Sequence, residues 1–267
     1  MLSSFEPDHV ERNMAALVAA VAPGDDEASL RTRFHRALAQ VQRWKPPFGT
    51  DGEPLVDFDL EHPEVRAALR DIVGRADPAA VRITGEERER RARDIAAGAE
   101  RLAAYDPGAA RSLQLLAATI LVLRGEGMAG GSATGLIGTI WLFPDDRWDP
   151  VRFAENLLHE SVHLALFLDE MINTLYVVDH AALESDDALV TSAIRRVRRP
   201  YDRSLHAACV AVELIDYHEH AGNAEAAARM REGVAASTVE LADKARVLSP
   251  HGREVLAELI ERSGVAA

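Results

Sequence analysis

The sequence PVRFAENLLHESVHLALF at residues 150–167 decides the fold expected of this chain. Its apolar residues recur at helical spacing, and Asp149 and Pro150 are residue types that favour the N-cap and the first position of a helix. His159 and His163 lie four residues apart in this stretch, so one helical turn places both imidazoles on one face. Two imidazoles on one face can bind a single metal ion. The stretch therefore predicts a buried metal-binding helix; the alternative is a helix with two structural histidines.

Length and composition indicate one large domain. The chain has 267 residues, 48% of them hydrophobic, which is enough for a substantial core. We predict a mainly α fold with a small β element, in which the histidine helix lies beside a short sheet. The predicted single domain, 1–267, comprises an N-terminal helical subregion (1–107), a metal core (108–223) and C-terminal helices (224–267).

The apolar segments are too short for a membrane-spanning helix. The longest run, residues 113–123, is interrupted by Gln114 and cannot cross a bilayer. The first residues lack the basic and apolar stretches of a signal peptide. We therefore expect a cytoplasmic protein.

The net charge limits the kinds of partner that we expect, and the single cysteine limits the covalent bonds within the chain. The formal net charge of −13 argues against a surface for nucleic acid or for an anionic membrane, and leaves a cationic or neutral substrate open. Cys209 is the only cysteine, so the chain cannot form a disulfide within itself. Because it lies in an apolar helical stretch, we expect a buried side chain.

Hydrophobic periodicity places helices along most of the chain. Apolar residues at helical spacing predict helices at 28–44, 63–75, 86–105, 110–124, after Pro200, at 224–247 and at 250–263. The Pro- and Gly-rich residues 45–52 predict a loop, and the glycines of 130–135 predict a break. Residues 136–143 predict a buried strand that leads into the histidine helix. The edge of this strand could hold a substrate beside the metal, or the strand could only pack against the helix.

A third metal ligand must come from elsewhere in the chain. Asp169 has the spacing of the third ligand in H-E-x-x-H-x-x-G-x-x-H/D, but Leu166 replaces the glycine that would turn the chain back. Glu184 lies in the range where gluzincin peptidases bring a glutamate ligand from a later helix, but its acidic run is more typical of a solvated surface. His206 and Glu213 lie on one face of a predicted helix and remain as candidates.

Three segments together resemble a known family. They are Gly138–Leu142, Glu155–His163, and Arg199-Pro200 followed by Leu205-His206. This order resembles the bacterial H-E-x-x-H peptide-modification proteins, the α-ketoglutarate-dependent β-hydroxylases associated with ribosomally made peptides and other specialised metabolites. The resemblance covers about a third of the chain, roughly Ser132–Tyr217. It implies that His159, His163 and His206 bind Fe(II), which departs from the usual set of two histidines and one carboxylate and keeps Glu213 as a substitute.

The expected cosubstrate, α-ketoglutarate, needs a partner for its distal carboxylate. A guanidinium is the best match, and Arg199, followed by Arg203, is our choice because both precede His206. The alternative is that these arginines only offset the acidic residues 182–190. Ser132 or Thr134 could supply a hydroxyl to a ligand.

The role of Glu160 depends on the chemistry. In a zinc metallopeptidase, the alternative function, it is the general base that activates water. In an oxygenase it would orient a ligand or contact substrate. A binding or scaffold module without activity is a third class. The sequence leaves open whether the substrate is a peptide, a free amino acid or a carrier-bound amino acid, as well as the oligomeric state.

Overall fold

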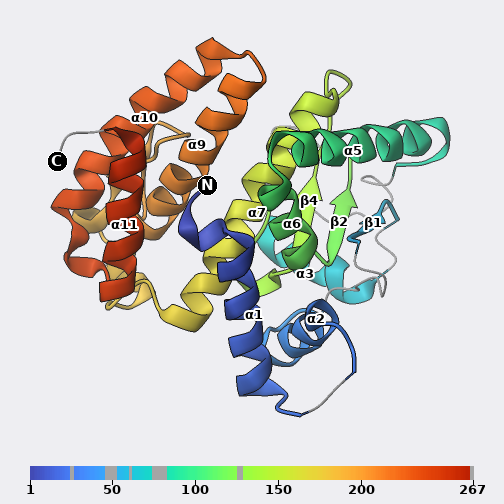
Figure 1. Cartoon of the computed structure of the whole chain (residues 1–267), viewed down its shortest axis with the longest axis horizontal. Helices are drawn as coiled ribbons and strands as arrows, with labels where there is room; N and C mark the ends of the chain where they lie inside the picture. The colour runs from blue at the N-terminus through green and yellow to red at the C-terminus, as the bar shows by residue number, and fades with distance from the viewer. Residues whose placement is uncertain (25–26, 46–52, 60–61, 74–82, 125–128, 265–267) are drawn as a thin grey trace. The chain divides into compact units, whose positions relative to one another are not determined.

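The computed structural model describes residues 1–24, 27–45, 53–59, 62–73, 83–124 and 129–264 (Figure 1). Most of the loop predicted at 45–52 lies outside the described residues. The chain divides into two compact units. The first, Phe5–Leu168, is called the motif unit here; the second, which joins Met1–Ser4 to Asp169–Ala267, is called the C-terminal unit. The single domain with three subregions stays a prediction.

The motif unit combines helices with a four-stranded sheet. Its helices are α1 (Pro7–Val21), α2 (Leu30–Val41), α3 (Pro63–Val73), α5 (Gly85–Tyr105), α6 (Pro107–Leu116) and the greater part of α7 (Pro150–Asn173). Its strands are β1 (Leu55–Asp57), β2 (Thr119–Val122), β3 (Gly130–Gly131) and β4 (Thr139–Leu142), and a 3₁₀ turn covers Thr134–Leu136. The prediction of a mainly α fold with a small β element is confirmed.

The sheet has the order β1-β2-β4-β3. β1 and β4 run parallel to β2, whereas β3 is antiparallel to β4 and pairs Gly131 with Trp141. Every residue of β2 and β4 is buried, as is typical of central parallel strands covered on both faces. On one face, Trp141 joins Leu121 and Phe143 in an apolar cluster with residues of α3. This cluster anchors the sheet on α3.

One helix prediction was wrong. We expected residues 110–124 to form a single helix, but α6 ends at Leu116, and β2 follows at Thr119–Val122. A short apolar run fits a buried strand as well as a buried helix, so periodicity alone does not separate them. The β-branched Thr119, Ile120 and Val122 favour the strand, and pairing with both β1 and β4 stabilises it. α1 was not predicted.

α7 begins where the sequence predicted. The Asp149 carboxylate accepts a hydrogen bond from the Arg152 backbone N–H (2.9 Å), so Asp149 caps the helix, and Pro150 is its first residue. The helix continues without a break through Leu166 to Asn173, so the chain does not turn back at Leu166. The strand expected at residues 136–143 is confirmed at Thr139–Leu142, before this helix, whereas Leu136 ends a 3₁₀ turn.

The C-terminal unit is built on three packed helices, α9 (Tyr201–His220), α10 (Ala224–Asp243) and α11 (Pro250–Ser263) (Figure 1). Smaller elements are α8 (His180–Leu183), the strands β5 (Val190–Thr191) and β6 (Arg198–Arg199), and 3₁₀ turns at Asp186–Ala188 and Ala245–Val247. The predicted helices after Pro200, at 224–247 and at 250–263 are confirmed, although the second ends at Asp243. Cys209 is buried in α9, as predicted.

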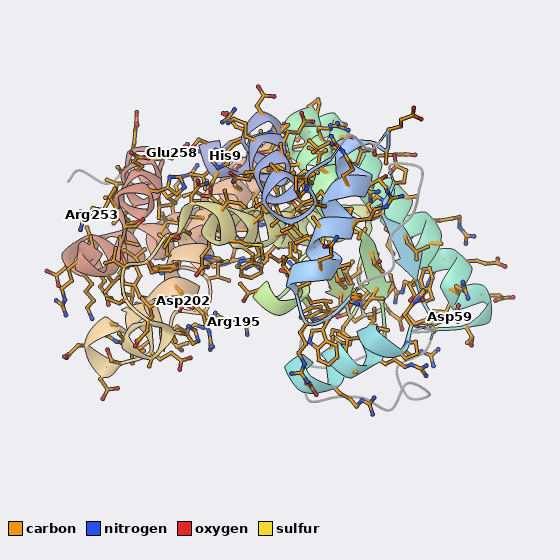
Figure 2. All side chains as sticks on the ribbon, turned by 90° about the horizontal axis from the view of Figure 1, so that it is seen from below. His9, Asp59, Arg195, Asp202, Arg253 and Glu258 are labelled. Carbon is orange, nitrogen blue, oxygen red and sulfur yellow. The ribbon has the colours of Figure 1, made fainter. Side chains whose placement is uncertain are left out.

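The first residues of the chain belong to the C-terminal unit. The Ser3 backbone N–H and hydroxyl both donate to the Glu258 carboxylate on α11, at 2.7 and 2.5 Å (Figure 2). Leu2 is fully buried.

Among the described residues, no helix is both long and apolar enough to cross a membrane.

We predict that Gly98→Ala destabilises the motif unit. Gly98 lies inside α5, and a Cβ there would lie 2.6 Å from the Phe153 Cβ on α7. Alanine improves helix propensity by about 0.5–1 kcal/mol, but overpacking against backbone and Cβ atoms costs roughly 1–3 kcal/mol. We therefore expect a lower midpoint in urea unfolding. Gly135→Ala, where a Cβ meets no atom within 4 Å, is the control and should leave the midpoint nearly unchanged. Equal midpoints for the two variants would contradict the close approach of α5 to α7.

Candidate metal centre

Two imidazoles lie on one face of α7. The ring centroids of His159 and His163 are 5.1 Å apart and the rings are tilted by 56°. Two imidazoles that bind one ion through bonds of about 2.0–2.1 Å at a near-tetrahedral angle would have centroids roughly 5 Å apart. The His163 ring also stacks on Phe167, with an interplanar angle of 15°, which fixes its plane. The spacing of the two ring centroids therefore fits a single metal ion.

Glu160 is buried beside these histidines. Only 4% of the residue is exposed, and the Ser132 hydroxyl donates a hydrogen bond to its Oε2 at 2.8 Å. Its Oε1 lies 3.9 Å from the His159 Nε2. Burial raises the pKa of Glu160 to about 7, and the Ser132 hydrogen bond partly opposes that rise. The carboxylate is thus held in one orientation next to a candidate ligand.

Glycines of β3 bring Ser132 to this carboxylate. A Cβ on Gly131 would lie 2.6 Å from the Trp141 Nε1, so only glycine lets the strand pack against this indole. Ser132 follows directly, and its hydroxyl reaches Glu160 rather than open space. Thr134, the other predicted hydroxyl, is exposed in the following 3₁₀ turn. From the sequence alone these glycines predict only a break, because their packing partner, Trp141 in β4, is 10 residues away from Gly131.

His206 lies in the C-terminal unit, in the second turn of α9. It is 4% exposed, and burial lowers its pKa to about 4, although the Asp202 and Asp169 carboxylates act in the opposite direction. The imidazole is therefore neutral near pH 7, which is the form that binds a metal. His159 and His163 belong to the motif unit, so the set of three histidines stays a prediction.

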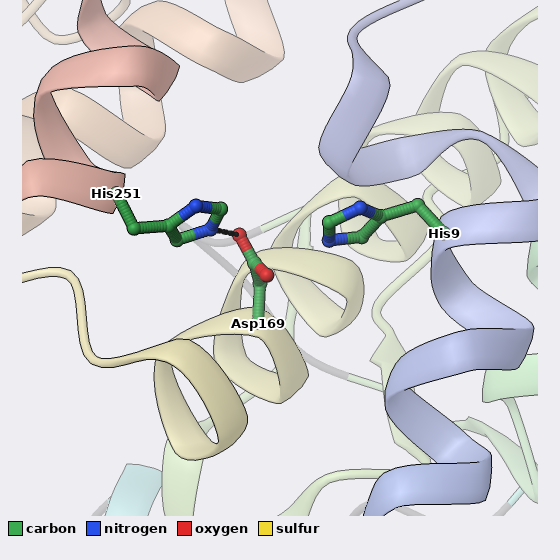
Figure 3. A group of neighbouring side chains, drawn as sticks. All are labelled: His9, Asp169 and His251. Carbon is green, nitrogen blue, oxygen red and sulfur yellow. Dashed lines mark hydrogen bonds and ion pairs between the residues drawn. The ribbon is translucent and has the colours of Figure 1, made fainter.

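The three competing carboxylates have partners in the C-terminal unit. Asp169 is fully buried and accepts hydrogen bonds from the His251 Nε2 (2.8 Å, Figure 3) and the Asn173 amide (2.7 Å). Glu184 pairs with Arg203 at 3.3 Å and with His180 at 3.4 Å. Glu213 accepts a hydrogen bond from the Leu2 backbone N–H (2.6 Å) and pairs with Arg262. A metal bound by one of these carboxylates would have to displace these partners.

The two predicted cosubstrate arginines differ in their surroundings. Arg203 is exposed on α9 and its guanidinium is paired with Glu184. Arg199 is half-buried at the end of β6. Burial, followed by repulsion from Arg195 and Arg203, lowers the pKa of Arg199, while Asp202 acts the other way. Arg199 is therefore the better candidate for binding an anion.

Comparisons with known proteins do not assign a family. No protein-family model matches the chain, and no curated protein is similar enough to count as a relative. The resemblance to the H-E-x-x-H β-hydroxylases consequently depends on the motif residues themselves.

We predict that His159→Ala and His163→Ala each abolish metal binding and leave the protein folded. The neighbouring Leu158, Val162 and Leu166 are buried, so the helix keeps its core contacts without one imidazole. Metal content after loading with Fe(II) or Zn²⁺, together with circular dichroism, measures both effects. His220→Ala, an exposed histidine at the end of α9, is the control. Stoichiometric metal in either α7 variant would place the site elsewhere.

A second prediction separates His206 from Asp169. His206→Ala should lose most of the metal affinity, whereas Asp169→Ala should keep it. The Asp169 variant loses stability instead, because removing this carboxylate deprives His251 and Asn173 of their acceptor. Metal titration and urea unfolding of both variants test this. Loss of metal from a folded Asp169→Ala protein would make Asp169 the third ligand.

Proposed function

We propose that this protein is a non-haem Fe(II)- and α-ketoglutarate-dependent oxygenase. The substrate would be hydroxylated at an unactivated carbon, the Cβ of an amino acid, either in a peptide or as a free or carrier-bound amino acid. One observation carries the proposal: His159 and His163 present two imidazoles on one face of α7, at a spacing that fits one ion. We further propose a cytoplasmic location.

The donor set supports iron as well as zinc. With His206 as a third ligand, three coordination positions stay open on an octahedral ion, which is enough for a chelating cosubstrate and O₂. Bound iron would supply the activation of O₂. The overall reaction balances as R–H, α-ketoglutarate and O₂ giving R–OH, succinate and CO₂, in which α-ketoglutarate supplies two electrons.

Residues of the chain would then bind the cosubstrate and orient a ligand or the substrate. Ser132 holds the Glu160 carboxylate beside His159, so that Glu160 can fix a ligand or contact substrate. The half-buried Arg199 can bind the distal carboxylate of α-ketoglutarate through two parallel N–H donors. Arg203 is the weaker candidate because its guanidinium is already paired with Glu184.

A zinc metallopeptidase is the second candidate. The raised pKa of Glu160, about 7, suits a general base near neutral pH, and this carboxylate lies next to a candidate ligand. In a peptidase, an arginine such as Arg199 would instead hold the oxyanion, so this guanidinium fits both functions. The resemblance to the β-hydroxylases favours the oxygenase.

We predict that the protein loaded with Fe(II) under O₂ converts α-ketoglutarate to succinate, and does so faster with its own substrate. Arg199→Ala should raise the α-ketoglutarate concentration needed for half-maximal turnover by about tenfold or more, since it removes a charged hydrogen bond. Its iron content should not change, because Arg199 is not a proposed ligand. Succinate formation and bound iron are measured on the same samples.

Arg253→Ala is the matched control for this experiment. Arg253 is an exposed arginine of α11 in the same unit, so the variant loses the same charge at another place (Figure 2). Its turnover should equal that of the unmodified protein. A protein that binds zinc tightly, cleaves peptides in a Glu160-dependent way and leaves α-ketoglutarate unchanged would establish the metallopeptidase instead.

A further inference from the structure

The β5–β6 hairpin of the C-terminal unit carries four arginines within five residues, Arg195, Arg196, Arg198 and Arg199. β5 and β6 are antiparallel and pair Val190 with Arg199. The connecting turn is closed by hydrogen bonds from Ser192 N–H to the Val197 carbonyl and from Arg196 N–H to the Ser192 carbonyl, both 3.0 Å. The hairpin is thus a defined structure and not an irregular basic loop.

The hairpin is also fixed to its neighbours. A Cβ on Gly233 of α10 would lie 2.1 Å from the Ala193 carbonyl oxygen, so the turn packs directly on this glycine. At the other end, the Ser204 hydroxyl of α9 donates to the Val190 carbonyl at 3.0 Å. The backbones of Arg195 and Arg199 are therefore held in place before any ligand binds.

Two of the four guanidiniums form ion pairs or hydrogen bonds within the C-terminal unit. Arg198 pairs with Glu240 of α10 at 3.1 Å and donates to the Leu189 carbonyl at 2.6 Å. Arg196 donates to the Arg229 carbonyl of α10 and lies 3.9 Å from the Glu232 carboxylate. Because adjacent residues of a strand point to opposite faces, Arg199 points away from the face on which Arg198 meets α10.

The other two guanidiniums have no such partner. Among the residues that the structure describes, no carboxylate forms an ion pair with Arg195 or Arg199. The nearby Asp202 carboxylate lies 3.7 Å from the His180 Nδ1, and its charge raises the pKa of Arg199 without forming an ion pair with that guanidinium. In a chain with 43 acidic and 30 basic residues, two neighbouring arginines without carboxylate partners keep a local positive potential that an anion can use.

The electrostatics agree with this geometry. After burial, repulsion from Arg195 is the next cause of the lowered pKa of Arg199, so the two positive charges act on each other. An anion between them would relieve this repulsion. A single carboxylate satisfies one guanidinium fork, whereas two forks match a ligand with two negative charges.

We infer that Arg195 and Arg199 form a binding site for a small dianion, a dicarboxylate or a phosphate monoester. Arg195 is a binding residue that the proposed function does not use, and the site does not depend on bound metal. α-Ketoglutarate is the dicarboxylate probe; its role as cosubstrate, in which only its distal carboxylate would reach Arg199, rests on the proposed function. Arg203 stays outside the site, since Glu184 holds it.

The test is isothermal titration of chelator-treated, metal-free protein with α-ketoglutarate, inorganic phosphate and acetate at one ionic strength. At least one dianion should bind about tenfold tighter than acetate. Arg195→Ala and Arg199→Ala should each weaken that dianion by about tenfold or more, as expected for loss of a hydrogen bond between charged groups. Arg253→Ala should change its affinity by less than about twofold, since its charge is remote from the site.

The outcomes distinguish the ligands. Arginine-dependent preference for α-ketoglutarate supports a dicarboxylate site, and preference for phosphate supports a phosphate monoester site. Arg199→Lys, which keeps the charge and loses the fork, should recover part of the affinity. Equal binding of acetate and both dianions, or unchanged affinity in Arg195→Ala, would overturn the inference. Arginine-dependent dianion binding without succinate formation would reject only the proposed oxygenase.

Discussion

The hydrogen bond between Ser132 and Glu160 is the interaction on which the candidate centre depends. It joins the residue after β3 to the helix that carries both histidines. Burial of an ionised carboxylate without a partner costs several kcal/mol or more, so the hydroxyl lowers the free-energy cost of keeping Glu160 inside. It also holds the carboxylate on one side of His159, where the carboxylate can orient this candidate ligand. Packing of Gly131 against Trp141 sets the strand position that makes this hydrogen bond possible.

Charge is distributed differently in the two units. In the motif unit, the candidate metal-binding groups are concentrated on one helix, where the buried Glu160 carboxylate lies 3.9 Å from the His159 Nε2. The C-terminal unit instead satisfies most of its buried charges with partners. Asp169 is bonded to His251 and Asn173, and Glu213 to Arg262 and the Leu2 backbone. Removing one partner of such a buried pair is strongly destabilising, because the other charge is left buried without a partner. The exposed Arg195 and the half-buried Arg199 have no carboxylate partner among the described residues, so their charges are open to an anion.

Local signals in the sequence predicted much of the fold. The Asp149 cap and the first-position Pro150 located the start of α7, because capping depends only on neighbouring residues. The continuous helix through Leu166 also followed from the missing glycine at that position. The same reasoning failed at residues 117–124, where the apolar run is compatible with a helix or a strand. Pairing of Thr119–Val122 with β1 and β4 decided for the strand, and such pairing is not readable from local periodicity.

The sequence by itself determined which residues share a helix face: His159 with His163, at four-residue spacing, and Leu158, Val162 and Leu166 in the core. Helical periodicity is local, so no tertiary information is needed for these relations. Only the tertiary structure decided that Ser132 holds Glu160, that Glu184 and Glu213 are bound by arginines, and that Arg195 and Arg199 have no carboxylate partner in the described part of the chain. Hydrogen bonds and ion pairs between residues far apart in sequence depend on packing that brings their elements together. The spacing of residues in the sequence does not predict that packing.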